Sequence, residues 1–246
     1  MVPIRKGCAA SLAALVLLLA ALTSLGLALL PAVVGLTCGV VLCVAVHRRL
    51  AAADSAALGP ADVVTLTRAI LTCALAALVV DTSLGEPAAA VLVPLAVVAL
   101  VLDAVDGRVA RVTRTVSAFG NRFDGEADAF LLLVLSVHVA PSYGWWVLAI
   151  GVARYAFGLA GWAASWLRVR LPFRYWRKVV TAVQGIALVV AAAGVLTRTA
   201  TYVVLIAALA LLAESFGRDL LWSWRRHGSA PARSIREAGE AQLQLP

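Results

Sequence analysis

The sequence has few charged residues and almost no lysine. Charged side chains make up 14% of its 246 residues, whereas 63% are hydrophobic. Soluble domains carry about 25% charged residues, so this composition argues against a soluble protein and favours a single membrane-embedded domain. Only Lys6 and Lys178 are lysines among the 21 basic residues. Such a preference for arginine indicates a GC-rich bacterial genome.

Cysteine motifs are also missing. The four cysteines, Cys8, Cys38, Cys43 and Cys73, all lie inside apolar runs. No C-x-x-C pair and no cysteine–histidine spacing typical of a metal site occurs in the sequence. This pattern argues against zinc-binding or redox motifs and predicts buried structural thiols.

Eight apolar runs follow one another, most of them close to the roughly 20 residues that a helix needs to cross a bilayer. They cover residues 8–30, 32–46, 63–80, 88–107, 119–139, 145–167, 179–196 and 200–217. The sequence therefore predicts an all-α polytopic membrane protein. The first run is longer than the apolar core of a usual signal peptide, so we expect an uncleaved first span.

The basic residues predict the orientation in the membrane. If Arg5 and Lys6 are cytoplasmic and the chain crosses at each run, 19 of the 21 basic residues fall on the cytoplasmic side. We therefore expect both termini in the cytoplasm and a location in the cell membrane. The net charge of +8 then reflects this orientation and contact with anionic headgroups, and nucleic acid is not an expected partner.

Residues 103–128, DAVDGRVARVTRTVSAFGNRFDGEAD, place five acidic side chains and four arginines between two apolar runs. Asp103 and Asp106 share one face of a helix, and Asp124 and Asp128 share a face of the next. Ser117 is a candidate N-cap of that second helix. Antiparallel packing of the two helices then brings the four carboxylates together near the cytoplasmic end.

A carboxylate in a membrane span costs on the order of 3 kcal/mol by insertion scales, so the cluster needs a counter-charge. The candidate ligands are all hard oxygens, which favours Mg²⁺, Mn²⁺ or Ca²⁺ over Zn²⁺. Small residues, Gly107, Ala110 and Gly120, leave room for a ligand, and Arg111 is a suitable phosphate donor. Carboxylates, a hard metal and arginines together indicate phosphoryl transfer. Arg108, Arg114 and Glu126 are interpreted as ordinary loop charges.

The pattern D-x2-D-G-x2-A-R-x8-G-x3-D-x3-D is met at every fixed position of residues 103–128. It closely resembles the signature of the CDP-alcohol phosphatidyltransferases. The segments PADVVTLTRAIL at 60–71 and KVVTAVQ at 178–184 are similar to further elements of that family. The resemblance covers about 60–217 and implies a six-helix transmembrane core. The predicted units are an accessory N-terminal hairpin at 1–58, the transferase domain at 59–222 and a mobile cytoplasmic tail at 223–246.

The resemblance implies a reaction in phospholipid biosynthesis. A CDP-alcohol, most often CDP-diacylglycerol, is attacked by the hydroxyl of a small polar acceptor, and CMP is released. Two divalent ions, Mg²⁺ or Mn²⁺, would be bound by Asp103, Asp106, Asp124 and Asp128. Asp128 would also be the general base. The implied CDP-binding residues are Gly107, Ala110, Arg111, Gly120, Thr65 and Arg68. The family also implies a homodimer.

Candidate acceptor-binding residues follow from two other features. Arg154 is a basic residue well inside a predicted span, and such residues line polar cavities or pair with an acid. Lys178, Thr181 and Gln184 recur at intervals of three and share a helical face. These basic groups favour a phosphorylated acceptor, although glycerol phosphate, inositol phosphate, inositol and serine all remain open.

Two other functions use acidic clusters in membranes. An intramembrane prenyltransferase holds Mg²⁺ on two aspartate-rich motifs, but these lie on well-separated segments, whereas here all four aspartates fall within 26 residues. A cation transporter places its acids near the middle of the bilayer, whereas these are predicted at helix ends beside arginines. The sequence favours the transferase over both alternatives.

Overall fold

The computed structural model describes residues 2–51, 57–84, 89–113, 117–163 and 175–242. Within these ranges it has eight α-helices, which confirms the all-α prediction. They are α1 (Ile4–Ser24), α2 (Leu29–Ala51), α3 (Pro60–Ser83), α4 (Ala89–Val112), α5 (Ala118–Tyr143), α6 (Leu148–Ala163), α7 (Tyr175–Ala193) and α8 (Arg198–Gln242). A short 3₁₀ helix, η1 (Trp145–Val147), precedes α6. Each helix overlaps at least one predicted span.

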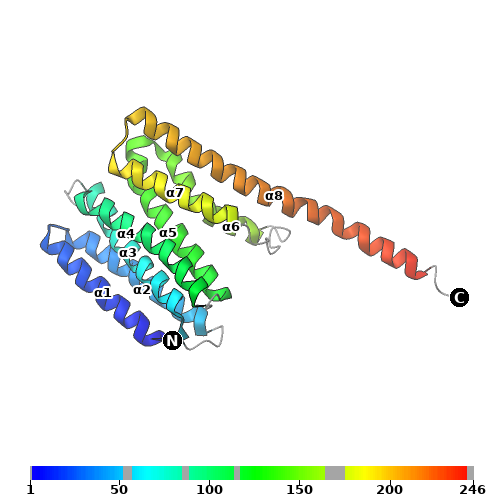
Figure 1. Cartoon of the computed structure of the whole chain (residues 1–246), viewed down its shortest axis with the longest axis horizontal. Coiled ribbons are helices and arrows are strands. Elements are labelled where there is room, and N and C mark those ends of the chain that lie inside the picture. The colour runs from blue at the N-terminus through cyan, green and yellow to red at the C-terminus, as the bar shows by residue number, and fades with distance from the viewer. Residues whose placement is uncertain (1, 52–56, 85–88, 114–116, 164–174, 243–246) are drawn as a thin grey trace.

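The helix α3 is the centre of the bundle and packs against α1, α2, α4 and α5. The hairpin of α1 and α2 lies along one side of the bundle, and α7 and α8 lie along the opposite side (Figure 1). Small residues allow this close packing. A Cβ atom on Gly35 of α2 would come within 2.9 Å of the Ala77 side chain and of the Cys73 carbonyl on α3. Small residues at contact points are typical of helix packing in membranes.

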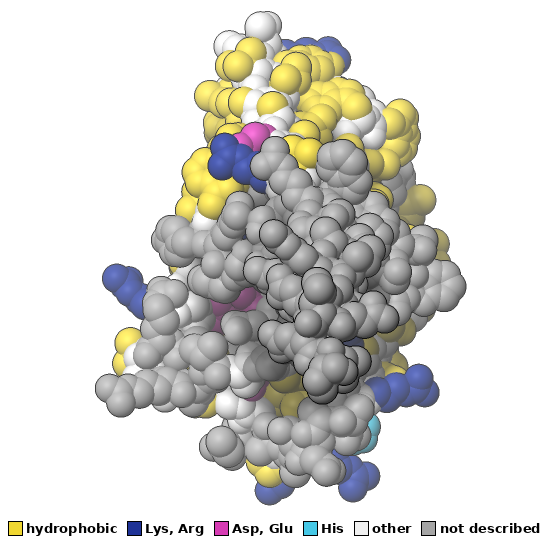
Figure 2. Space-filling view, turned by 90° about the vertical axis from the view of Figure 1, so that its right-hand side faces the viewer, with side chains coloured by type: hydrophobic (Ala, Val, Ile, Leu, Met, Phe, Trp, Pro, Cys, Tyr) yellow, Lys and Arg dark blue, Asp and Glu magenta, His cyan; other side chains and the backbone are white. Residues whose placement is uncertain are grey.

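Within the part of the chain that the structure describes, five helices are long and apolar enough in composition to cross a membrane: α1, α2, α3, α7 and α8. The helices α4 and α5, which carry the aspartates, are not among them. On the face toward which α8 extends, basic side chains lie around the rim and acidic atoms are visible deeper, near the middle (Figure 2). The protein is therefore a polytopic helical membrane protein, and Asp103, Asp106 and Asp124 lie close together near one end of α4 and α5.

Two features differ from the sequence-based expectation. A two-residue antiparallel pair joins β1 (Val2–Pro3) to β2 (Ala57–Leu58), so the start of the chain is tied to the segment that enters α3. In addition, α8 continues as helix to Gln242, where the composition predicts a tail without regular structure. Ala, Arg, Glu and Gln recur in this last stretch, and their high helix propensities favour propagation of α8.

A buried carboxylate fastens the N-terminal hairpin to the core. Asp81 in α3 is fully buried, and its Oδ1 accepts a hydrogen bond of 3.1 Å from the Ala28 amide, just before α2. We expect Asp81→Ala to lower the free energy of unfolding by about 1–3 kcal/mol, because the amide then lacks an acceptor in an apolar site. Thermal unfolding of the purified protein in detergent measures this effect. Asp81→Asn retains an acceptor oxygen and is the control, so equal losses in both variants would contradict the assigned hydrogen bond.

Candidate active site

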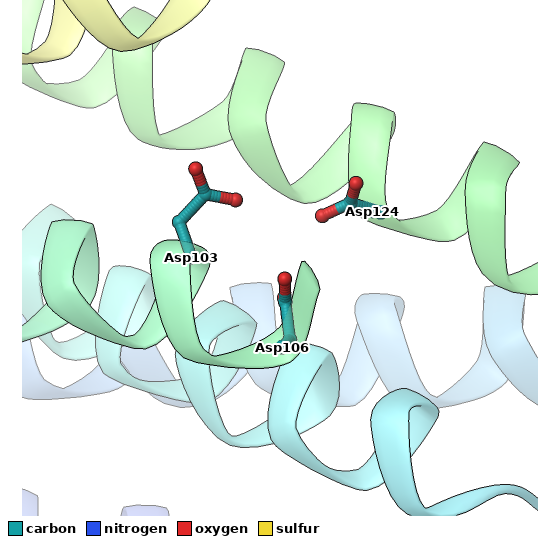
Figure 3. Close-up of side chains that lie close together, drawn as sticks. All are labelled: Asp103, Asp106 and Asp124. Carbon is teal, nitrogen blue, oxygen red and sulfur yellow. The ribbon is translucent and has the colours of Figure 1, made fainter. Parts of the chain in front are cut away.

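Three of the predicted metal ligands come together at one point of the bundle. Asp103 and Asp106 point from α4 toward Asp124 on α5 (Figure 3). One carboxylate oxygen from each lies within 4.8 Å of the others. Asp106 is buried, and the other two are partly exposed. The convergence that the helical spacing predicts is therefore present.

The two helices are positioned by shared neighbours. Both α4 and α5 pack against α3 and against α7, so the carboxylates meet where four helices converge. The start of α5 is fixed by Ser117, whose hydroxyl accepts a hydrogen bond of 2.8 Å from the Gly120 amide. This confirms Ser117 as the N-cap. The cap determines where the turns of α5 begin and hence the direction in which Asp124 and Asp128 point.

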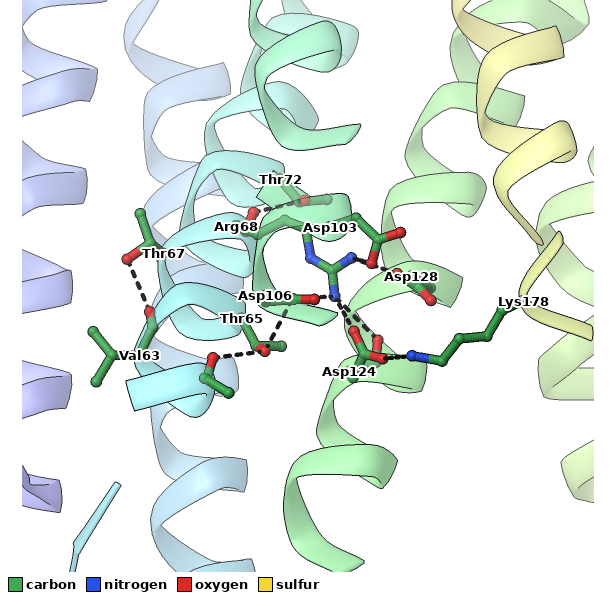
Figure 4. Close-up of polar contacts among 11 residues, drawn as sticks. Val63, Thr65, Thr67, Arg68, Thr72, Asp103, Asp106, Asp124, Asp128 and Lys178 are labelled. Atoms are coloured by element: carbon green, nitrogen blue, oxygen red, sulfur yellow. Dashed lines mark hydrogen bonds and ion pairs between the residues drawn. The ribbon is translucent and has the colours of Figure 1, made fainter. Parts of the chain in front are cut away.

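Part of the counter-charge of the cluster comes from the protein itself. The fully buried guanidinium of Arg68, on α3, lies among four carboxylates (Figure 4). Its Nη2 lies 2.7 Å from Asp124 and 3.4 Å from Asp106. Its Nη1 lies 2.6 Å from Asp128 and also pairs with Asp103. Arg68 therefore links the aspartates of both helices.

A second cation borders the cluster. The ammonium group of Lys178, on α7, lies 3.3 Å from Asp124, and about half of the side chain is exposed. Among the described residues, the ion pairs of these four carboxylates are with Arg68 and Lys178. Counted against these two cations, four ionised carboxylates leave two negative charges uncompensated. This excess charge, together with the close oxygens of Asp103, Asp106 and Asp124, fits a divalent cation. The residues present are thus suitable for the implied metal.

A small pocket of about 40 Å³ opens beside the carboxylates. It gathers residues predicted for the CDP moiety, the metal and the acceptor, namely Thr65, Gly107, Gly120, Asp106, Asp124 and Lys178. The Thr65 hydroxyl, 3.2 Å from Asp106 Oδ2, donates a hydrogen bond to it. Arg68 does not line this pocket, since it lies among the carboxylates. The side chains of Ala110 and Arg111 lie outside the described residues.

Two polar residues that the sequence analysis did not single out also line the pocket: Asp62 and Asn121. Asp62 Oδ2 accepts a hydrogen bond of 2.9 Å from the Gly59 amide at the start of α3. The sequence did contain an indication that Asp62 belongs to the site: it precedes Thr65 by three residues and therefore lies on the same helical face. Asp62 also lies in the first turn of α3, where acidic residues commonly cap a helix.

The predicted acceptor-binding residues are not all at the cluster. Arg154 is exposed on α6 and lies against α5, where a Cβ on Gly125 would come within 2.5 Å of its guanidinium. Gln184 is buried and donates a hydrogen bond of 2.7 Å to the Ala208 carbonyl of α8. Thr181 donates to the Arg177 carbonyl within its own helix. Of these residues, only Lys178 contacts an aspartate in the structure.

Gly120 allows α5 to approach α3 at the mouth of the pocket. A Cβ atom there would lie 2.7 Å from Asp62 Oδ1 and 3.0 Å from Ser117 Oγ. We expect Gly120→Ala to weaken binding of a CDP-alcohol by at least about fivefold, because overpacking displaces the neighbouring groups. Equilibrium binding of CDP-diacylglycerol measures the change. Gly158→Ala on α6 is the matched control, since a Cβ there meets nothing within 4 Å; equal affinities for the two variants would contradict the prediction.

Comparison with known proteins identifies the family. The family model described as CDP-alcohol phosphatidyltransferase matches residues 58–213, which is more than half of the chain. Two curated proteins named CDP-diacylglycerol–serine O-phosphatidyltransferase, from two strains of Helicobacter pylori, are 45% and 44% identical to this chain over 75 residues. These stretches cover 30% of this chain and 28% of each relative. No solved structure matches. Three aspartates of the signature converge in the structure. The family model spans the helices that carry them, so this chain belongs to the CDP-alcohol phosphatidyltransferase family.

Proposed function

We propose that this protein transfers a substituted phosphate from a CDP-alcohol, specifically CDP-diacylglycerol, to the hydroxyl of a small polar acceptor and releases CMP. The observation that carries the proposal is the convergence of Asp103, Asp106 and Asp124 from two helices beside a pocket. The family match supports the same reaction class. The product is a phospholipid, which places the reaction in phospholipid biosynthesis.

Charge balance supports a diphosphate substrate. The cluster retains two uncompensated negative charges when Arg68 and Lys178 are counted. Two divalent ions, Mg²⁺ or Mn²⁺, held by Asp103, Asp106, Asp124 and Asp128 would make the site positive by two charges. The diphosphate of a CDP-alcohol carries two negative charges and would balance it. Such ions would neutralise the diphosphate and the charge on the departing phosphate.

We assign Asp128 as the general base. It lies one helical turn beyond Asp124 on the same face of α5 and is therefore further from the pocket mouth. A carboxylate here accepts the proton of the acceptor hydroxyl as the oxygen attacks the phosphorus atom that bears the lipid alcohol. The bond between that phosphorus and the bridging diphosphate oxygen breaks, and CMP departs with the bond's electron pair. The hydrogen bond of 2.6 Å from Arg68 orients the carboxylate.

The surroundings favour an acceptor that carries an anionic group. Lys178 is half-exposed beside Asp124, and the exposed guanidinium of Arg154 lies against Gly125, the residue after Asp124. Both cations suit a phosphate or a carboxylate. The Helicobacter pylori relatives are named for serine, and serine has such a carboxylate. We therefore propose either a phosphorylated alcohol or serine in preference to neutral inositol or glycerol.

The acceptor is tested with a panel of compounds. Purified protein is supplied with CDP-diacylglycerol, Mn²⁺ and one of serine, glycerol phosphate, inositol phosphate, inositol or glycerol, and the lipid product is identified by mass. We expect CMP release and a new phospholipid with serine or one of the phosphates. A product formed only with a neutral alcohol would contradict the assignment of an anionic acceptor while leaving the transferase reaction intact.

The site is proposed to face the cytoplasm. The aspartates lie near the C-terminal end of α4 and the N-terminal end of α5, the end where the basic residues predict cytoplasm. This placement argues against the cation transporter, whose acids would be near the middle of the bilayer. The prenyltransferase alternative is disfavoured by the family match. The homodimer implied by the family remains a prediction.

A further inference from the structure

The N-terminal hairpin, which lies outside the region that matches the family model, forms one wall of a large groove. Val41 and Leu42 of α2 line one side, Phe123 and Phe130 of α5 line the other, and Tyr155 of α6 contributes to the lining. The groove has a volume of about 870 Å³. This size is at the upper end of ligand pockets, which measure about 300–1,000 Å³.

The groove is separate from the carboxylate cluster. Phe123 and Phe130 lie at least about 100° around α5 from the direction of Asp124 and Asp128. None of the residues that line the groove lines the pocket beside the aspartates. Its occupant is therefore not the CDP moiety in that pocket.

Two arginines at one end of the groove give it a charge preference. Arg49 lies in the last turn of α2 and Arg122 in the first turns of α5, and both side chains are exposed. Neither makes an ion pair with another residue that the structure describes. Glu126 lies one turn further along α5 and lines the same groove. The three groups leave one net positive charge, which matches the single negative charge of a phosphodiester.

The apolar walls of the groove indicate that the ligand also has a hydrocarbon part. In a bilayer, a groove lined by aliphatic and aromatic side chains is filled by hydrocarbon, and arginines at the membrane surface attract anionic headgroups. A molecule that satisfies both parts has a phosphodiester at one end and acyl chains at the other. We propose that the groove binds a membrane phospholipid, with its phosphodiester between Arg49 and Arg122 and an acyl chain along α2 and α5. The bound lipid would bridge the accessory hairpin and the transferase core.

Native mass spectrometry of the full chain, washed free of lipid in detergent and then supplied with phosphatidylglycerol, tests the proposal. We expect one retained phosphatidylglycerol in the wild type. The double variant Arg49→Gln/Arg122→Gln should bind it at least about tenfold more weakly, since each arginine contributes to phosphate attraction. Diacylglycerol, which lacks the phosphate, and glycerol phosphate, which lacks the chains, should both bind much more weakly than the complete phospholipid.

Two further variants make the test specific. Arg48→Gln removes the neighbouring charge on α2, which does not line the groove, and should retain the lipid. Ala45→Trp keeps the arginines but fills the groove and should also lose the lipid. Equal retention by all variants would overturn the proposal. Another outcome would also overturn it. If the wild type forms a dimer that retains no lipid, and this dimer dissociates in the double variant, then a second copy of the chain occupies the groove.

Discussion

Asp128→Asn is expected to lower the rate of CMP release by about 10²–10⁴-fold, the usual contribution of a general base. The amide cannot accept the proton of the attacking hydroxyl, although its size and its place on α5 are unchanged. Binding of CDP-diacylglycerol should be largely retained, because the pocket is lined by other residues. Single-turnover CMP release and equilibrium binding, measured on the same preparation, separate the two effects.

The control for this variant is Glu214→Gln on α8. It makes the same chemical change at a partly exposed acid that pairs with Arg218 and not with the aspartate cluster. Its CMP release should stay close to that of the wild type. If Asp128→Asn turns over as fast as the control, Asp128 is not the base. If it no longer binds the CDP-lipid, its main role is to hold the donor site together.

Arg68→Gln is expected to have the largest effect on stability. Removing one partner of a buried ion pair costs about 3–5 kcal/mol, because the remaining charge is left without compensation. Here the guanidinium is fully buried and pairs with four carboxylates. We expect the melting temperature in detergent with a chelator to fall well below that of the wild type. Added Mn²⁺ should restore part of the loss, since it supplies positive charge to the same carboxylates.

Two matched variants accompany this measurement. Arg218→Gln breaks an exposed pair with Glu214 on α8, and such pairs contribute about 0–1 kcal/mol, so its melting temperature should hardly change. Arg68→Lys retains the charge and should be intermediate. An Arg68→Gln protein that melts like the wild type in chelator would show that the carboxylates do not depend on this guanidinium. If Mn²⁺ stabilises neither Arg68→Gln nor Arg218→Gln, which keeps the aspartate cluster intact, that would argue against a metal on these aspartates.

The helical spacing of the sequence was sufficient to predict the centre of the site. Asp103 and Asp106 lie three residues apart, and Asp124 and Asp128 lie four apart, so each pair must share a helical face. The structure brings Asp103, Asp106 and Asp124 together, and Asp128 is linked to them through Arg68. Ser117 caps α5 as expected. These predictions depend on short-range geometry, which the sequence specifies directly.

Contacts between distant helices were harder to predict. Arg68 is 35 residues before Asp103 and 60 before Asp128, so nothing in local spacing indicates that it lies among the carboxylates. Gln184 shares a helical face with Lys178 in the sequence, yet its amide bonds to α8. The groove along α2 could not be predicted from the sequence either, because it depends on how the N-terminal hairpin packs beside α5. Each of these features is set by tertiary packing.

The most direct test of the proposed function is CMP formation by the purified wild-type chain in the presence and absence of divalent metal. The protein is stripped with a chelator, supplied with CDP-diacylglycerol and the acceptor panel, and then titrated with Mg²⁺ or Mn²⁺. We expect no CMP in the stripped protein, CMP and phospholipid in equal amounts once metal is added, and no recovery in Asp128→Asn. Full CMP release under complete chelation would contradict the metal-dependent transferase that the aspartate cluster supports.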